Sequence, residues 1–262
     1  MRRLGTYAAS AYLIAAYVFI FLPVLVLVLF SFQDGLLPVP PFKGPSLRWY
    51  AEVFANRRLM DALGNSVVVA LVSSLIATVL GFLAAYGLAR RRGRFAGLVQ
   101  YALVAPLTVS YLIIGLGLLV TFNLFGMPKS LLAVGIGHVV INLPLTFAIL
   151  YSQLGDHQAR VERAARDLGA GDLATVALIT VPMMWPGLLA AFCLTATFSW
   201  DEFIIAFLLS RFEVTLPVSI WGMLRSGLDP ALNAAGTLVF AISFVLVIGV
   251  ELGLMRAARK RR

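Results

Sequence analysis

Residues 155–182 have the sequence GDHQARVERAARDLGAGDLATVALITVP and connect two long apolar stretches. An apolar stripe at i, i+3, i+4 and i+7 predicts a short helix and is formed by Val161, Ala164, Ala165 and Leu168. Gly169 follows this stripe, where helices often end on a glycine in the left-handed region. Asp172 is suited to cap a second helix over 174–180, and Pro182 to separate that helix from the next apolar stretch. We expect an elbow of two helices whose small outward side chains fit a groove on a partner, since a merely solvated loop needs no apolar stripe.

Six apolar stretches make up most of the remaining chain: 7–32, 65–89, 97–125, 131–154, 185–210 and 232–255. Each exceeds the roughly 18–20 residues that cross a hydrocarbon layer of about 30 Å. The composition agrees, because 61% hydrophobic and 13% charged residues, with a mean hydropathy of +0.94, are too apolar for a soluble chain. Strand-like alternation is absent. We therefore expect an all-α, polytopic membrane protein with six transmembrane helices in one domain over 1–262, whose first stretch is an uncleaved span and not a signal peptide.

Lys and Arg are distributed unevenly between the two sets of connecting segments. Fourteen lie on one side: Arg2, Arg3, Arg90, Arg91, Arg92, Arg94, Arg160, Arg163, Arg166, Arg256, Arg259, Lys260, Arg261 and Arg262. Seven lie on the other: Lys43, Arg48, Arg57, Arg58, Lys129, Arg211 and Arg225. The positive-inside rule places the first group, and with it the elbow and both termini, in the cytoplasm. The net charge of +9 is thus explained by membrane topology, and no nucleic-acid partner is expected.

The connecting segment 33–64 would lie outside. It begins with a proline-rich piece and continues as an amphipathic stretch. We expect a helix lying on the outer membrane surface, with Trp49 at the interface. Its apolar side would carry Leu47, Tyr50, Val53, Phe54 and Leu63.

The elbow resembles the cytoplasmic loop of ABC-importer permeases, in which Glu-Ala-Ala is followed after three residues by Gly, and after nine more by Ile-x-Leu-Pro. The matching positions hold Ala164-Ala165, Gly169, Ile179 and Pro182. Two positions depart from the pattern, since Arg163 stands in place of the glutamate, next to Glu162, and Val181 precedes the proline. The resemblance implies that the elbow docks an ATPase subunit. The docking residues would be Glu162, Arg163, Ala164, Ala165, Asp167, Leu168, Gly169, Ile179 and Pro182.

The resemblance extends to Asn65-Ser66, to FSWDEF at 198–203 and to TLPVSIWGM at 215–223, and is greatest to the second permease of spermidine/putrescine importers. An acidic Pro-Glu found in the third span of many such permeases is replaced here by Pro106-Leu107. The resemblance implies a type I ABC importer permease fold in a bacterial inner membrane. It also implies a second permease, two cytoplasmic ATPase subunits and an external solute-binding protein as partners. No phosphate-binding loop occurs in the sequence, so we expect no enzyme activity and no cofactor on this chain, with ATP and Mg²⁺ used by the ATPase subunits.

Two adjacent acids, Asp201 and Glu202, lie within the stretch 185–210. A charged side chain at the centre of a membrane helix costs about 2.5–3.5 kcal/mol, so at least one should face a water-filled path or a partner span. The candidate path residues are Trp200, Asp201, Glu202, Phe203, Tyr111 and Asn142. Trp200 and Phe203 would add cation–π attraction for an ammonium group. The alternative is an ion pair that packs this helix against the partner permease. His138 is expected to face the helix bundle and form a hydrogen bond.

These patterns favour a permease subunit that imports a polyamine. The runner-up is the same role for another small solute, such as an amino-acid-like, opine or phosphonate compound. The rival from a different class is an ATP-independent secondary transporter, which often contains internal repeats. No persuasive repeat is found in the sequence.

Overall fold

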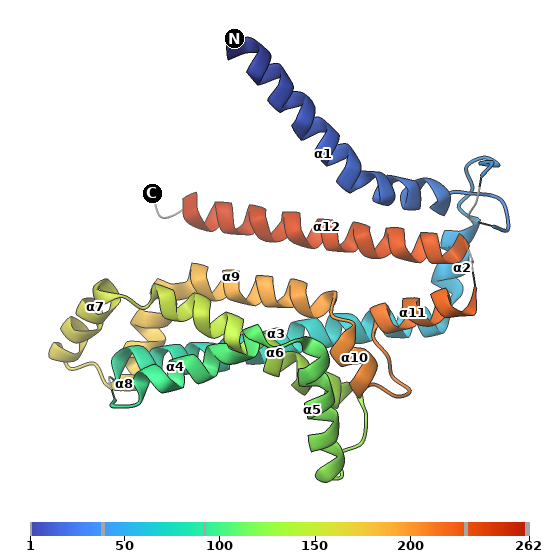
Figure 1. Ribbon diagram of the computed structural model, residues 1–262. Coiled ribbons are helices and arrows are strands. Elements are labelled where there is room, and N and C mark those ends of the chain that lie inside the picture. The colour runs from blue at the N-terminus through green and yellow to red at the C-terminus, as the bar shows by residue number, and fades with distance from the viewer. Residues whose placement is uncertain (1, 38–39, 92, 228–229, 260–262) are drawn as a thin grey trace. The chain divides into compact units, whose positions relative to one another are not determined.

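The computed structural model describes residues 2–37, 40–91, 93–227 and 230–259, and throughout these ranges the regular elements are helices (Figure 1). Five helices of the described chain are long and apolar enough to cross a membrane. They lie in α1 (Arg2–Ser31), α3 (Arg57–Arg90), α6 (Leu131–Gln153), the continuous run Asp172–Trp200, and α12 (Pro230–Arg259). A sixth span results if the bent pair Ala96–Thr108 and Tyr111–Leu124 counts as one. The predicted all-α fold is confirmed.

The chain forms two compact units, one of Met1–Met60 with Ser219–Ser243 and one of Asp61–Val218 with Phe244–Arg262. In the first unit, the segment after α1 is anchored to α2 (Arg48–Ala55). Trp49 Nε1 donates a 2.7 Å hydrogen bond to the carbonyl oxygen of Gln33, and the hydroxyl oxygens of Ser31 and Tyr50 lie 2.7 Å apart. These bonds tie the segment that follows α1 to α2.

The expected single surface helix through Leu63 is wrong. Helix α2 ends at Ala55, and α3 begins at Arg57. Asn56 between them has an extended backbone (ψ 97°), and its side-chain Oδ1 accepts a hydrogen bond from the backbone N–H of Leu59. Asn56 thus interrupts one helix and caps the next, since short polar side chains compete with helical backbone hydrogen bonds. Leu63 consequently belongs to α3.

In the second unit, α6 packs against both α3 and α9 (Val181–Trp200). Thr146 of α6 donates a 2.8 Å hydrogen bond to the carbonyl oxygen of Ala77 in α3. Close approach of these two helices depends on Gly81. A Cβ added there would meet Thr146 Oγ1 and lie 3.0 Å from the backbone nitrogen of Phe147. Small residues at such contacts let membrane helices pack tightly.

Gly81→Ala should therefore destabilise the protein by about 1–3 kcal/mol, because the added methyl group has no room between α3 and α6. Gly87 on the same helix is the matched control, since an added Cβ there meets nothing within 4 Å. Gly87→Ala should be neutral or stabilise by up to about 1 kcal/mol, because alanine favours the helix. Thermal unfolding midpoints of the two purified variants check this. Equal midpoints would contradict the close packing at Gly81.

The expected uninterrupted span over 97–125 is broken into α4 (Ala96–Val104), the 3-10 turn η1 (Ala105–Thr108) and α5 (Tyr111–Leu124). The two parts meet at 106°, and α5 turns sharply away from α4 (Figure 1). The break has a local cause. Val109 and Ser110 are extended, and the Ser110 hydroxyl accepts a hydrogen bond from the N–H of Leu112 as the N-cap of α5.

Pro182 was expected to separate the second elbow helix from the following span, and this is wrong. Helix α8 (Asp172–Thr175), the π-helical turn η2 (Val176–Thr180) and α9 run on without interruption. Pro182 lies inside this run as the second residue of α9, directly after the π-helical turn, where the N–H of Val181 donates to the carbonyl of Val176. At the other end, α9 stops at Trp200 and a separate short helix, α10 (Ile204–Leu209), follows. The acids of 201–202 therefore lie at a helix break.

Candidate functional site

The elbow consists of α7 (Asp156–Asp167) and α8, joined by a tight turn. Gly169 has φ +91°, so the predicted left-handed glycine is confirmed. Its N–H donates to the carbonyl of Arg166 at 2.9 Å, and the N–H of Ala170 donates to the carbonyl of Ala165 at 3.0 Å. This pair of bonds is the Schellman motif, which satisfies the last carbonyls of a helix and reverses the chain.

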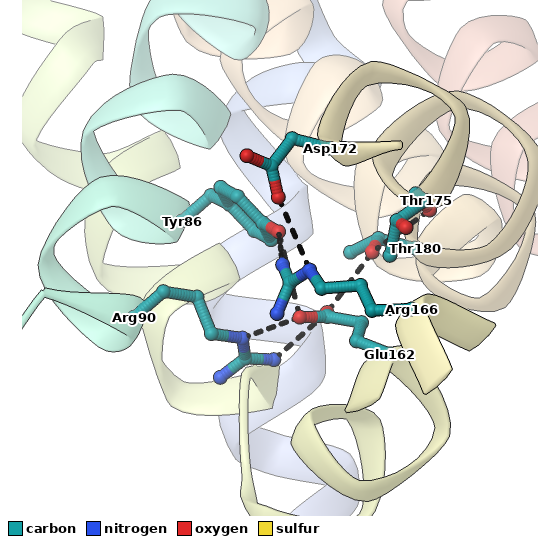
Figure 2. A network of polar contacts seen from close by, with 7 residues as sticks. All are labelled: Tyr86, Arg90, Glu162, Arg166, Asp172, Thr175 and Thr180. Carbon is teal, nitrogen blue, oxygen red and sulfur yellow. Dashed lines mark hydrogen bonds and ion pairs between the residues drawn. The ribbon is translucent and has the colours of Figure 1, made fainter. Parts of the chain in front are cut away.

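Glu162 is the centre of a network that holds the elbow to the rest of the second unit (Figure 2). Its side chain is fully buried. Arg90, the last residue of α3, donates to both carboxylate oxygens, at 2.7 Å from Nε and 3.0 Å from Nη2. Thr180 of η2 donates its hydroxyl to Oε1 at 2.9 Å, and the Tyr86 hydroxyl lies 3.5 Å from Oε2. One carboxylate thus joins α3, α7 and η2.

Burial alone would raise the pKa of Glu162, but hydrogen bonds from Arg90 and Thr180 and the charge of Arg90 outweigh it and hold the pKa below its ordinary value. The group is therefore ionised at neutral pH. Because the folded pKa is lowered, the stability contributed by this pair is present above the ordinary pKa of glutamate and is lost as the pH falls through the lowered value. Removing one partner of such a buried pair costs about 3–5 kcal/mol.

A second ion pair lies closer to the solvent. Arg166 Nε is 3.1 Å from a carboxylate oxygen of Asp172, and Arg166 Nη2 donates to the Tyr86 hydroxyl at 3.2 Å. The side chains of Arg166 and Asp172 are 38% and 90% exposed, so this pair is worth about 0–1 kcal/mol. The expected capping by Asp172 is wrong: Gly171 is the N-cap of α8, and the Asp172 carboxylate binds Arg166 instead.

The other face of the elbow is exposed and partly apolar. Leu168, Leu173 and Leu178 are 90%, 87% and 75% exposed. The remaining predicted docking residues divide as follows: Arg163, Ala164, Asp167, Gly169 and Pro182 are exposed, Ile179 is half-buried, and Glu162 and Ala165 are buried. The apolar stripe is therefore split, since Ala165 packs inward while Ala164 and Leu168 point outward.

The break between α9 and α10 separates the two adjacent acids. Glu202 is buried, and its carboxylate accepts hydrogen bonds from the backbone N–H groups of Ile204 (2.8 Å), Ile205 (3.0 Å) and Ala206 (3.2 Å). It caps α10 in this way. Asp201 is exposed. The two carboxylates thus have different surroundings, because Asp201 is exposed and Glu202 is buried.

The buried His138 of α6 lies between Glu202 and Ser199 of α9. Its Nε2 lies 3.4 Å from Glu202 Oε2, and its Nδ1 lies 2.6 Å from the hydroxyl of Ser199. The Ser199 hydroxyl is in turn 3.1 Å from that of Ser73 on α3. The predicted role of His138 as a bundle-facing hydrogen-bonding residue is confirmed, and α3, α6 and α9 meet at this point.

The other predicted path residues do not gather around Asp201 on an exposed surface. Trp200 and Asn142 are buried, at 4% and 2% exposure. Phe203 is half-buried, and its ring stacks on Phe207 with centroids 5.3 Å apart. Tyr111 is half-buried at the start of α5 and packs against a core cluster that includes Ile205. Of the six candidates, Asp201 alone combines charge with exposure.

Sequence reasoning missed the roles of Arg90, Tyr86 and Thr180 in the elbow network. Arg90 belongs to a run of basic residues, and that run explains it as a topology anchor without any specific partner. Thr180 lies in an apolar stretch, and no sequence pattern marks it as a hydrogen-bond partner of Glu162. Glu162 offers a clue, because it is an acid in the middle of a helix that carries Arg160, Arg163 and Arg166.

Comparison with known proteins identifies the family. Residues 77–261 match the family model described as "Binding-protein-dependent transport system inner membrane component". The chain is 33% identical to the putrescine transport system permease protein PotI of Escherichia coli K12, over 95% of this chain and 91% of that protein. It is 28% identical to the spermidine/putrescine transport system permease protein PotC of the same strain, over 95% and 94%. A probable molybdenum ABC transporter permease of Haloferax volcanii is 32% identical over 74% and 76%.

Two solved structures have the same fold. A bacterial ABC transporter for the import of the acidic polysaccharide alginate matches with a TM-score of 0.69 at 19% identity, covering 97% of this chain and 96% of that one. The MetNI methionine ABC transporter matches with a TM-score of 0.59 at 15% identity, covering 77% and 98%. The predicted type I ABC importer permease fold is therefore confirmed. The chain belongs to the family of inner-membrane components of binding-protein-dependent transport systems and is a polytopic ABC permease subunit, not itself a catalyst.

Proposed function

We propose that this chain forms half of the membrane path of an ATP-driven importer and that the solute is a polyamine. The other half is a second permease, two ATPase subunits bind on the cytoplasmic side, and a solute-binding protein delivers the solute from outside. Family membership supports this assembly, and the excess of basic residues beside the elbow and the termini supports their cytoplasmic location. Differential contact of the elbow with the two nucleotide states of the ATPase couples hydrolysis to alternating access.

The exposed leucines of the elbow carry the docking part of the proposal. Leu168 and Leu173 are 90% and 87% exposed on a segment whose opposite side is fixed by the buried Glu162. Two large apolar side chains held outward on a rigid polar segment are typical of a protein–protein contact. The neighbouring Arg160 and Arg163 are exposed as well, so the groove that receives the elbow should be acidic at its rim.

Replacing both leucines with aspartate should reduce the ATPase recovered with the purified permease several-fold, because two charges would enter an apolar contact. The amount of permease in the membrane should not change, since neither side chain is buried. Leu36→Asp is the matched control, because Leu36 is 71% exposed in the segment proposed to lie outside. Full ATPase recovery with the double variant would contradict docking through this face.

The polyamine assignment is supported by the similarity to PotI and PotC and by the exposed carboxylate of Asp201. The runner-up, another small solute, is supported by the Haloferax permease at a comparable identity. The charge of the solute distinguishes a polyamine from the runner-up, since the Asp201 carboxylate attracts a polyamine and repels an oxyanion such as molybdate. Uptake of labelled putrescine and spermidine, with molybdate as competitor, tests the assignment. Uptake that molybdate blocks and spermidine does not would favour the runner-up.

A further inference from the structure

Two routes lead from the elbow to the membrane helices. The first follows the backbone, because α8, η2 and α9 form one continuous run from Asp172 to Trp200. The second is made of side chains. Glu162 of α7 binds Arg90 at the end of α3 and lies beside the hydroxyl of Tyr86, while Thr180 binds the same carboxylate from η2 (Figure 2). The two routes therefore meet at one buried group.

The outer half of α3 is tied to the region that follows the helix break. Asn65 Nδ2 donates to the carbonyl of Val214 at 3.1 Å, and the N–H of Leu216 donates to the Ser66 hydroxyl at 2.7 Å. Nearer the middle of α3, the Ser73 hydroxyl forms a hydrogen bond with the hydroxyl of Ser199, which lies two residues before Asp201. Asn65 and Arg90 lie on the same unbroken helix, about 37 Å apart along its axis. Helix α3 thus connects the elbow with both sides of the break that exposes Asp201.

We propose that Arg90 is a positioning residue for transport, which holds α3 to the elbow through Glu162. Movement of the docked elbow then reaches the outer end of the path along α3 as well as along α9. The inference rests on the proposed docking of the elbow to an ATPase. Without the pair, the elbow still moves α9 through the backbone, but α3 no longer follows.

The chemistry of the pair suits this role. Glu162 is fully buried, and two parallel hydrogen bonds fix the orientation of the Arg90 guanidinium, so separation would leave an unpaired charge inside the protein. The Arg166–Asp172 pair resists separation far less, because its members are 38% and 90% exposed to water. The η2 turn beside Thr180 is π-helical, a geometry that often occurs at functional positions in helices.

The test uses the permease complex purified from membranes and placed in vesicles, with labelled putrescine as the probe. The double variant Arg90→Gln/Glu162→Gln removes both charges, so no buried charge is left without its partner. We expect it to assemble and hydrolyse ATP, while putrescine transported per ATP hydrolysed falls at least fivefold. Arg90→Gln alone should also lower the yield of complex, and Arg90→Lys should recover at least half of the coupling. Arg91→Gln is the matched control, because Arg91 is the exposed neighbour of Arg90.

A second measurement does not depend on the solute. A cysteine replacing the exposed Asp61 near the outer end of α3, in a Cys193→Ser background, should change its alkylation rate at least threefold on ATP binding. The double variant should abolish that change. Unaltered coupling or an unaltered ATP response in the double variant would overturn the proposal. A double variant that assembles as poorly as Arg90→Gln alone would do so too, because the pair would then serve folding alone. A wild-type complex without bound ATPase would instead contradict the proposed function, before any variant is compared.

Discussion

Asp201→Asn should lower polyamine uptake at least tenfold while leaving the permease complex assembled. The substitution preserves the shape of the side chain and removes its charge. Asp201 is exposed at the break between α9 and α10. If the proposed path passes this break, the carboxylate attracts the entering cation. Loss of about 1.4 kcal/mol of attraction at the rate-limiting step is already a factor of ten. Uptake of labelled putrescine, measured beside the yield of complex from the same membranes, checks the result.

Two neighbouring acids sharpen this experiment. Glu202→Gln should mainly lower the yield of complex, because Glu202 is buried and caps α10 through backbone hydrogen bonds. Glu213→Gln should change neither quantity, since Glu213 is an exposed acid that lies outside the break. If Asp201→Asn lowers yield and uptake together, the carboxylate instead pairs with a partner span. Unchanged uptake by a well-assembled complex would remove Asp201 from the path.

Gly169→Val should abolish recovery of the ATPase with the purified permease, a reduction of at least tenfold, while the permease still inserts in the membrane. Gly169 has φ +91°, a conformation that a β-branched residue rarely adopts. The variant must rebuild the turn, which carries Leu168 at one end and leads to Leu173. Leu168 and Leu173 would then no longer be held in their present relative positions, although neither side chain has been replaced.

Gly171→Val is the matched control for the turn. Gly171 lies two residues further on, has φ −68° and ψ 164°, and an added Cβ there meets nothing within 4 Å. Valine tolerates this extended backbone, so recovery of the ATPase should stay near that of the unaltered protein. A comparable loss in both variants would show that bulk in the turn, not the left-handed backbone of Gly169, disturbs docking.

The predictable part of the fold is the part determined by local patterns. Apolar length predicts α1, α6 and α12 because lipid forces a helix on any such stretch. The breaks at Val109–Ser110 and Asp201–Phe203 escape this reasoning, since apolar residues continue on both sides of each. Asn56 likewise divides α2 from α3 through one side-chain hydrogen bond, which hydropathy does not register.

The candidate site shows the same division. The turn at Gly169 was predictable, because the reason for a glycine there lies in the residues next to it. The pairing of Arg90 with Glu162 was not, since the two lie 72 positions apart and several other arginines could have served equally well. The different surroundings of Asp201 and Glu202 depend on where α9 ends, and hydropathy does not mark that point because apolar residues continue into α10.

The bent pair of α4–η1 and α5 has a consequence for how the protein is made. Helix α5 has 14 residues, about 21 Å of helix, which is too short to cross the bilayer alone. Its packing surface is also supplied late, because Gly115 of α5 lies against Leu208 and Ile205 of α10, roughly 90 residues further along the chain. At ordinary translation speeds α10 emerges about 5–20 s after α5. During that interval α5 must be sheltered by the insertion machinery or by α6, so biogenesis of this subunit depends on a helix that cannot hold its own place in the membrane.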